Sequence, residues 1–414
     1  MMVGKFYTID DFDVEGKTVL LRIDINSPVD PNTGSILDDT RMKLHSKTIL
    51  ELARKGARVI ILAHQSRPGK KDFTTLRQHS DVLSRLLRRK VKYVDSIFST
   101  PAKLAINNLR PGEILLLENV RFFSEESLKR PIEQQAQSMI VRELSPLIDY
   151  FVNDAFAAAH RGQVSLVGFT LNTPSAAGRV MEHELHIIQS TLDNVKSPCV
   201  FALGGMKADD SIMVAENVCE NGTADYVLTS GLVANIFLAA AGYNIGKPNM
   251  DLIKSQGYLD MIDKCKGLLE KYPNQIVYPK DVAVEIGNER VDVSIDEIPD
   301  YPIYDIGKNT SAEYAKSIMH AETIFANGPA GVFENPLFSI GTEDIINAIV
   351  SSNGYSIIGG GHIGAATVNM GYENKVNHVS SGGGACINLL AGKKLDAVEA
   401  LINNKKRFDK KLNL

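Results

Sequence analysis

The amino-acid sequence predicts an α/β fold made of two doubly wound (Rossmann-like) parallel-sheet domains joined by a hinge helix. A chain of 414 residues exceeds the size at which one hydrophobic core keeps growing, so two domains of about 200 residues each are expected. Both halves alternate runs rich in Val, Ile and Leu with amphipathic segments of helix length. The runs show no period-2 alternation, which is typical of parallel strands covered on both faces.

Strands are predicted in the first half at five apolar runs, 17–25, 57–63, 90–94, 113–120 and 149–156. Amphipathic helices are predicted between them, for example at 46–56 and 74–89. In the second half each predicted strand runs directly into a turn, and these units cover 199–205, 225–231, 275–279, 323–328, 355–361 and 376–384. The second domain is therefore expected to be of the same class as the first.

The segment between the halves, 172–195, starts with turn residues and continues as a helical pattern. We expect domains at 1–174 and 198–395, an interdomain hinge helix at 175–197, and a C-terminal segment at 396–414 that packs back on the first domain. An ordinary surface helix would give the same pattern at 175–197, so the hinge role stays open at this point.

Composition excludes several classes of partner. The 45 Lys and Arg against 49 Asp and Glu leave a net charge of −4, which gives no global field for nucleic acid or an anionic membrane. No apolar run is long enough to cross a bilayer, and the first residues lack the pattern of a signal peptide, so a cytoplasmic protein is expected. The four cysteines have no zinc-like spacing and are interpreted as small apolar residues in a reducing compartment.

Basic and polar side chains follow the predicted strands of the first half. The carboxyl ends of parallel strands meet in one crevice, so we expect convergence there of Arg41, His64, Arg67, Arg121 and Arg161. Such a cluster predicts a pocket for a small anionic, phosphorylated molecule. Asp24 and Asn26 could orient a substrate hydroxyl or simply bond their own turn before Pro28, and the sequence does not decide between these uses.

The strand ends of the second half carry glycines instead. The segment 356–364 contains the spacing GxGxxG, but the next strand runs into Ser380 and Ser381 instead of the acidic residue that an NAD site needs. No GxxxxGK[ST] sequence is present either. Several glycine-led helix starts remain, and together they favour a nucleotide held by backbone N–H groups.

Two side chains of the second half have competing interpretations. Lys207 follows two glycines at a strand end, where it could accompany a transferring phosphoryl group or be a surface lysine. Glu334 could accept hydrogen bonds from ribose hydroxyls or be an ordinary loop residue. No nucleophile–base pattern accompanies them, so phosphoryl transfer without a covalent intermediate fits best.

Nine motifs, in order from about residue 17 to 400, resemble phosphoglycerate kinase, and their spelling resembles its archaeal branch. They are RIDINSP, DDTR, AHQSRP, LLLENVRF, NDAFAAAHR, LGGMK, NGPAGVFE, IIGGGH and SSGGGACINLLAG. The resemblance implies a monomeric two-lobed enzyme that closes about its hinge. It would transfer a phosphoryl group directly, in line, between 1,3-bisphosphoglycerate and ADP, giving 3-phosphoglycerate and ATP, with Mg²⁺ as cofactor.

The same resemblance implies roles for individual residues. The first domain would bind phosphoglycerate through Asp24, Ile25, Asn26, Arg41, His64, Gln65, Ser66, Arg67, Arg121 and Arg161. The second would bind the nucleotide through Lys207, Gly231, Asn327, Glu334, Gly359, Gly360, Gly361, His362 and Ile363. Catalysis would fall to Arg41, Lys207, Gly383 and Gly384.

Two positions depart from the family pattern. The usual GGGDT places an Asp on the metal–nucleotide, whereas this chain has His362 and Ile363 after its glycines. Mg²⁺ prefers oxygen ligands, so either the phosphates and water hold it or Asp210 supplies an oxygen, and the metal ligands stay unassigned. Ser211 stands where the pattern has a second lysine, so the number of cations around the transferring group is open.

Two other functions compete with kinase activity. A two-domain binding protein could close on a phosphorylated metabolite without chemistry, but it would need no second phosphate site. An NAD-dependent dehydrogenase is disfavoured by the missing ribose-binding acid.

Overall fold

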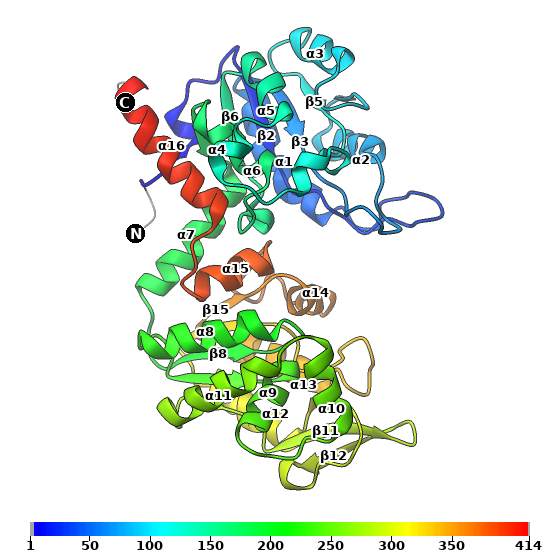
Figure 1. The fold of residues 1–414 in the computed structure, drawn as a ribbon, viewed down its shortest axis with the longest axis vertical. Coiled ribbons are helices and arrows are strands. Elements are labelled where there is room, and N and C mark those ends of the chain that lie inside the picture. Colours follow the sequence, from blue (N-terminus) through cyan, green and yellow to red (C-terminus); the bar gives the residue numbers. More distant parts are fainter. Residues whose placement is uncertain (1–3, 413–414) are drawn as a thin grey trace. The chain divides into compact units, whose positions relative to one another are not determined.

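The computed structural model describes residues 4–412, which divide into two compact units (Figure 1). Unit 1 consists of Met1–Gln189 and Lys394–Leu414, and unit 2 consists of Ser190–Lys393. Helix α7 (Arg179–Asp193) crosses the chain boundary between the units. The two units are described separately below.

Unit 1 is built on a seven-stranded sheet with the order β1-β7-β6-β2-β3-β5-β4. All of its strand pairs are parallel. The strands are β1 (Tyr7–Thr8), β2 (Thr18–Arg22), β3 (Arg58–Leu62), β4 (Val91–Tyr93), β5 (Ile114–Leu116), β6 (Tyr150–Asn153) and β7 (Ser175–Ala177). From β2 the chain first builds β3 on one side and later returns to β6 on the other, so the topological switch point lies between β2 and β6.

Helices cover both faces of this sheet. The longer ones are α1 (Thr40–Arg54), α2 (Arg77–Leu87), α3 (Thr100–Asn107), α7 and α16 (Asp396–Leu412), and the shorter ones are α4 (Ile132–Gln135), α5 (Met139–Leu144) and α6 (Val164–Val167). Leu20 belongs to the apolar cluster on one face and Leu21 to the cluster on the other, and both are fully buried. Double coverage explains why these strands appear in the sequence as unbroken apolar runs.

Two details of unit 1 differ from the segment boundaries expected from the sequence. Ser175–Ala177 form strand β7, in parallel register with Phe151–Asn153, and the helix starts only at Arg179. Their small side chains fit the fully buried position beside β6. Helix α16 packs against the same region, where the Asn404 side chain accepts a hydrogen bond from the Ser175 amide at 2.9 Å.

Unit 2 is built on a six-stranded parallel sheet with the order β10-β9-β8-β14-β15-β16. Its strands are β8 (Cys199–Leu203), β9 (Tyr226–Thr229), β10 (Ile276–Val277), β14 (Thr323–Asn327), β15 (Tyr355–Ile358) and β16 (His378–Val379). The helices are α8 (Ala208–Glu220), α9 (Gly231–Ala240), α10 (Lys247–Ser255), α11 (Leu259–Lys271), α12 (Lys308–Met319), α13 (Ile340–Ser351), α14 (His362–Asn369) and α15 (Gly383–Leu390). The switch point lies between β8 and β14.

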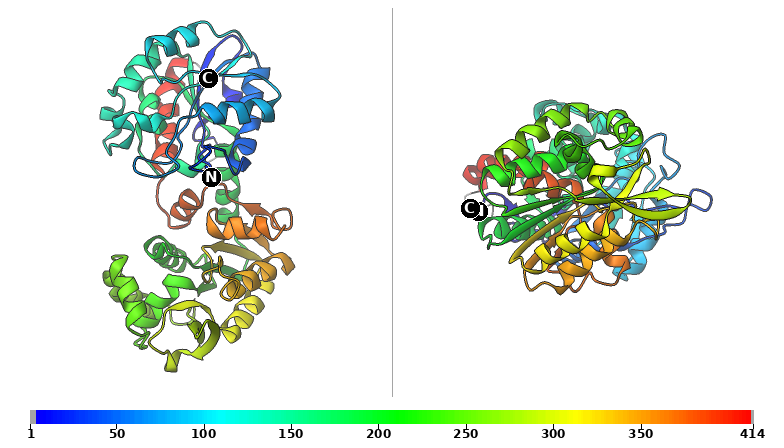
Figure 2. Two further views of the ribbon diagram at one scale, coloured as in Figure 1. Left: turned by 90° about the vertical axis from the view of Figure 1, so that its right-hand side faces the viewer. Right: turned by 90° about the horizontal axis from the view of Figure 1, so that it is seen from below.

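A second, antiparallel sheet in unit 2 was not anticipated from the sequence. It has the order β12-β11-β13, formed by Asp281–Ile286 (β11), Glu289–Ser294 (β12) and Ile303–Ile306 (β13). The hairpin β11–β12 turns at Gly287 and Asn288, which both have positive φ, as a tight two-residue turn requires. The hairpin extends from the edge of unit 2 (Figure 1; Figure 2, right).

No helix among residues 4–412 combines the length and the apolar composition needed to cross a lipid bilayer.

Candidate active site

The polar residues predicted in unit 1 lie at one edge of its sheet. Asp24, His64, Arg121 and Arg161 follow strands β2, β3, β5 and β6, which are neighbours in the order β6-β2-β3-β5. Asp24 and His64 are almost completely buried, whereas Arg67 and Arg161 are exposed. The edge therefore combines fixed inner groups with outer guanidinium groups that can reach a ligand.

Arg41 lies in the first turn of α1. A cation is unfavourable at a helix N-terminus, and here the Asp24 carboxylate offsets that cost with an ion pair of 2.5 Å. Burial by itself raises the pKa of Asp24, but the charge of Arg41, with the hydrogen bond from the Asn26 amide and the charge of Arg22, outweighs burial and lowers the pKa below its usual value. The Arg41 side chain remains 40% exposed, so it can still contact an anion.

His64 is fixed from behind by Arg22, a residue that the sequence analysis missed. Arg22 is fully buried, and its guanidinium lies 3.0 Å from His64 Nδ1. A guanidinium can only donate, so Nδ1 accepts and the proton of the neutral ring lies on Nε2. Burial, with Arg22 and other arginines adding to it against the opposing charge of Asp24, lowers the pKa of His64 well below its usual value. The ring is thus a neutral donor.

The charge of Arg22 is balanced inside unit 1. Its Nε donates to Ser165 Oγ at 2.9 Å, and the Ser165 hydroxyl donates to the buried Glu126 carboxylate at 2.8 Å. Burial raises the pKa of Glu126 even though Arg22 opposes the shift. This polar layer supports the binding edge without contacting solvent.

The loops after β2 and β3 are held together by hydrogen bonds. The Asn26 side chain accepts from the Ser66 amide at 2.6 Å, and the Gln65 side chain bonds both the amide and the carbonyl of Ser27. Ser66 has φ of 53°, an unusual conformation for a residue with a side chain. Arg121 donates to the Ser66 carbonyl. Ile25 and Gln65 are fully buried, and the backbone amide and carbonyl of Gln65 are both bonded to the Asn119 side chain.

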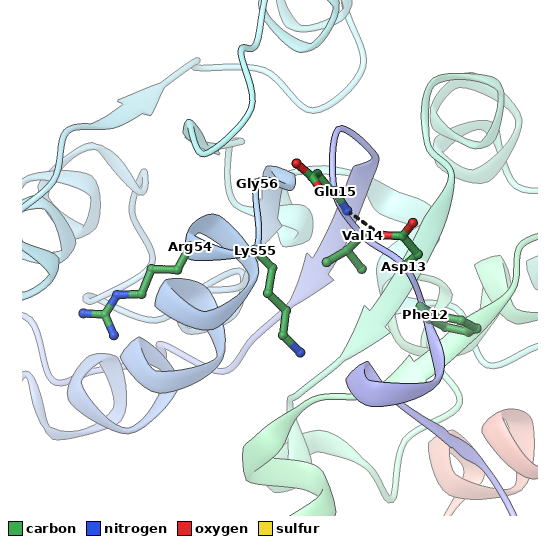
Figure 3. Close-up of a pocket in the computed structure, with 7 residues that line it drawn as sticks. All are labelled: Phe12, Asp13, Val14, Glu15, Arg54, Lys55 and Gly56. Carbon is green, nitrogen blue, oxygen red and sulfur yellow. Dashed lines mark hydrogen bonds between the residues drawn. The ribbon is translucent and has the colours of Figure 1, made fainter.

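Among the surface hollows of unit 1 are two of similar size. One, of about 470 Å³, lies beside Arg121 and is also lined by Pro68, Phe73, Phe122, Ser124 and Ser127. The other, of about 440 Å³, lies before the amino ends of β2 and β3 (Figure 3) and is lined by Phe12, Asp13, Val14, Glu15, Arg54, Lys55 and Gly56. Its two acids and two bases give no preference for an anion, so only the first hollow belongs to the candidate site.

In unit 2, backbone amides occupy the corresponding edge. Helices α8, α9, α14 and α15 begin within a few residues of the ends of β8, β9, β15 and β16. Their first turns leave N–H groups without helical partners, and the helix dipole adds a partial positive charge. Gly231 and Gly383 are the first residues of two of these helices, so no side chain covers the N–H groups there.

The glycine turns of unit 2 also contact one another. A Cβ added to Gly328 would lie 2.2 Å from the Gly204 carbonyl oxygen, and one added to Gly360 would lie 2.7 Å from the Gly383 nitrogen. A Cβ on Gly359 would lie 2.2 Å from Asn327 Oδ1. These contacts bring the loops after β8, β14, β15 and β16 together, and any larger residue would force them apart.

The predicted side chains of unit 2 are mostly exposed. Lys207 precedes the first turn of α8 and has no ion-pair partner within the described part of the chain. Glu334 is exposed, and so is His362, whose ring centre is 5.9 Å from that of Phe333. Ile363 is buried and contributes to the core. Exposure leaves Lys207, Glu334 and His362 available to a ligand.

Neither departure from the family pattern provides a carboxylate or a lysine side chain. Ser211 is fully buried, and its hydroxyl has no hydrogen-bond partner among the groups that the structure describes. Asp210 is partly exposed and pairs with Lys393 at 3.4 Å. Over residues 4–412 there is no cluster of three or more His, Cys, Asp or Glu side chains suited to a metal. Mg²⁺ commonly takes one carboxylate with substrate phosphates and water, an arrangement that Asp210 can fit.

Comparison with known proteins gives consistent matches over nearly the whole chain. A family model described as phosphoglycerate kinase matches residues 9–393. The phosphoglycerate kinase of Methanothermobacter thermautotrophicus is 64% identical over 397 residues, which cover 96% of this chain and 97% of that protein. That of Methanococcus maripaludis is 53% identical over 405 residues, covering 96% and 98%.

The solved structures that this chain resembles belong to the same family as the sequence matches. The crystal structure of phosphoglycerate kinase from Pyrococcus horikoshii matches with a TM-score of 0.90 at 40% identity, and the match covers 97% of this chain and all of that one. The structure of phosphoglycerate kinase from Coxiella burnetii matches with a TM-score of 0.79 at 31% identity, covering 96% and 99%. The fold class predicted from the sequence is confirmed.

Proposed function

The chain belongs to the phosphoglycerate kinase family, and from this premise we propose that its two units divide the reaction between them. The enzyme transfers a phosphoryl group reversibly between 1,3-bisphosphoglycerate and ADP, giving 3-phosphoglycerate and ATP. Unit 1 binds the phosphoglycerate, and unit 2 binds the nucleotide. The observation that supports this division is the contrast between side-chain cations at one sheet edge and bare helix N-termini at the other.

On the phosphoglycerate side, the outer guanidinium groups of Arg67, Arg121 and Arg161 bind the phosphate. Guanidinium groups match phosphate oxygens in bidentate geometry. His64 donates from Nε2 to the glycerate, because Arg22 holds Nδ1 as the acceptor. The side chains of Asp24 and Asn26 orient the glycerate hydroxyl.

On the nucleotide side, the phosphates lie against the N–H groups that begin α8, α14 and α15. The residues proposed to form this site are Lys207, Gly231, Asn327, Glu334, Gly359, Gly360, Gly361, His362 and Ile363. Glu334 accepts hydrogen bonds from the ribose hydroxyls. The absence of side chains at the glycines allows phosphate oxygens to approach the backbone closely.

Charge neutralisation is the main catalytic task. The acceptor carboxylate of 3-phosphoglycerate is ionised at neutral pH, so no general base is required. Arg41, Lys207 and the N–H groups of Gly383 and Gly384 neutralise the charge on the transferring phosphoryl group. Arg41 exchanges its contact with Asp24 for one with the phosphoryl group as transfer proceeds.

We propose Mg²⁺ as the cofactor, held by the nucleotide phosphates, water and the Asp210 carboxylate. When bound, it would neutralise part of the phosphate charge. Asp210 would then leave its contact with Lys393, which is already long at 3.4 Å. His362 is not a ligand in this arrangement.

Three further assignments complete the proposal. Helix α7 acts as the hinge element between the units, and small-angle scattering should show compaction only when both substrates are bound. The protein is a monomer, which sedimentation would check. It acts in the cytoplasm, a reducing compartment in which the four free cysteines, all buried, remain thiols.

The test of the division is a steady-state assay of ADP formation from 3-phosphoglycerate, ATP and magnesium. Arg121→Ala should raise KM for 3-phosphoglycerate about tenfold or more and leave KM for ATP within twofold, since it removes one charged phosphate contact. An equal rise in both constants would contradict the division. A lack of ADP formation under all conditions would instead favour the binding protein considered from the sequence, and binding of NADH would favour the dehydrogenase.

A further inference from the structure

One face of helix α1 is bonded to the start of helix α7. His45, Thr48 and Glu51 are spaced three residues apart and therefore lie along one side of α1. Thr48 Oγ1 accepts from the Arg179 amide at 3.2 Å, and the Glu51 carboxylate accepts from Arg179 Nε at 2.8 Å. His45 reaches the same turn of α7 through one intermediate residue, Asp154.

Asp154 is fully buried, and its carboxylate accepts a hydrogen bond from the first turn of α7. One oxygen accepts from the Val180 amide at 2.7 Å, and the other lies 2.8 Å from His45 Nδ1. Gly178 leaves room for this carboxylate, because a Cβ there would lie 2.2 Å from Asp154 Oδ1. A negative group at a helix N-terminus is stabilised by the dipole and by the free N–H groups. The start of α7 is therefore held by Asp154.

The other nitrogen of His45 reaches the loop proposed to hold phosphoglycerate. Nε2 lies 3.2 Å from the backbone amide of Asp24 and accepts its hydrogen. Nδ1 must then carry the ring hydrogen and donate it to Asp154. His45 is only 2% exposed, so water does not compete for these contacts. A continuous chain of hydrogen bonds runs from Asp24 through His45 and Asp154 to Val180.

We propose that His45 is a positioning residue that couples phosphoglycerate binding at the Asp24 loop to the first turn of α7. The inference rests on the proposed role of that loop and adds to it a path toward the helix that enters unit 2. His45 does not contact substrate. Ligand contacts that shift the Asp24 backbone shift the imidazole, and the imidazole shifts the carboxylate that holds α7.

Two substitutions break the chain at different links. In His45→Asn the side-chain amide occupies the place of Nδ1, so it can donate to Asp154 but cannot reach the Asp24 amide. In His45→Gln the longer side chain can accept from Asp24 but loses the bond to Asp154. Ile49→Val, one turn further along α1 and fully buried, is the matched control: it removes one buried methylene and leaves the polar chain intact.

The measurement is hydrogen exchange of the peptide covering 178–184, in the full-length protein, with and without 3-phosphoglycerate. The ligand should slow exchange in this peptide about tenfold in the natural protein and in Ile49→Val. In both His45 variants it should slow exchange less than twofold. The difference is on the scale of ordinary coupling free energies between two sites. In the same variants kcat should fall about tenfold, with KM for 3-phosphoglycerate changed less than threefold.

Several results would overturn the inference. A purely structural role would speed exchange in the His45 variants equally with and without ligand and leave the ligand effect intact. Loss of the ligand effect in Ile49→Val as well would assign it to lower stability. Calorimetry distinguishes failure of the proposed phosphoglycerate site from failure of the His45 role. If 3-phosphoglycerate binds to Arg121→Ala as well as to the natural protein, the proposed site is wrong. If the His45 variants bind it normally and keep the ligand effect on exchange, only the role of His45 is rejected.

Discussion

The two units present opposite groups at equivalent places. In unit 1 the carboxyl edge of the parallel sheet is lined by charged side chains, supported from behind by Arg22 and its partners. In unit 2 the same edge is lined by glycine backbone and helix N-termini, with loops so close that added Cβ atoms would collide. Side-chain recognition should therefore fail when a group is removed, and backbone recognition should fail when a group is added.

The strongest test of the side-chain edge is removal of Arg41. We expect Arg41→Ala to lower kcat about a hundredfold or more, the usual scale for losing a donor that acts in the transition state. Arg54→Ala, at the exposed far end of the same helix, is the matched control and should keep normal kcat. A near-normal kcat in Arg41→Ala would remove it from the catalytic groups.

The buried histidines of unit 1 predict a dependence of stability on pH. Burial lowers the pKa of His79 to about 4 and that of His64 well below 6.5. Below pH 6.5 the unfolded chain takes up protons that the folded chain does not. The free energy of unfolding therefore decreases as the pH is lowered, by about 1.4 kcal/mol per pH unit for each group. The raised pKa of Glu126 has the opposite effect between its unfolded and folded pKa values, because there the folded chain binds the additional proton.

Urea unfolding at pH 7 and pH 5 measures that dependence. His79→Gln removes one of the two groups and should reduce the loss by about 2 kcal/mol. His320→Gln changes an exposed histidine of unit 2 and should leave the loss unchanged. An equal decrease in the free energy of unfolding in all three proteins would show that the buried histidines do not control stability below pH 7.

The backbone edge should be sensitive to added bulk. A Cβ on Gly360 would lie 2.6 Å from the Ser380 carbonyl oxygen and 2.7 Å from the Gly383 nitrogen, so Gly360→Ala must separate the two loops. We expect KM for ATP to rise about tenfold, while calorimetric affinity for 3-phosphoglycerate stays normal. Gly267→Ala is the matched control, because Gly267, like Gly360, lacks a positive φ, and a Cβ added there would have no neighbouring atom within 4 Å.

The smallest expected effect concerns the metal. Asp210→Asn should raise the magnesium concentration for half-maximal rate about threefold, because a partly exposed carboxylate contributes little beyond the phosphates. Asp209→Asn is the neighbouring control, since Asp209 accepts from the Tyr258 hydroxyl at 3.2 Å. Identical magnesium titrations for both variants and the natural protein would exclude Asp210 as a ligand.

The sequence predicts the parallel sheets well because their strands are buried on both faces. Every predicted strand corresponds to an observed one, from β2 to β6 and from β8 to β16. The sheet β12-β11-β13 was missed because β12 is only partly buried and carries charged residues between its apolar ones, although the Gly287-Asn288 turn between two alternating segments is a recognisable hairpin signal. The positions of the polar motifs and of the glycine motifs likewise indicated which groups line the carboxyl edge of the parallel sheet in each unit.

The supporting layer could not be predicted in the same way. Arg22 ends an apolar run and resembles any polar strand end, and only the fold shows that it is fully buried. His45 lies on a helix whose pattern does not distinguish it from a surface position, and its partner Asp154 is 109 residues away. Pairings at such separation depend on the strand order, which sequence periodicity does not supply.

The hairpin β11–β12 leaves β12 as an edge strand, whose free backbone groups could pair with another molecule. Along β12, Glu289, Arg290 and Asp292 interrupt the apolar positions Val291 and Val293. Charged residues on an edge strand discourage intermolecular sheet formation. The hairpin can therefore extend into solvent without acting as a starting point for aggregation.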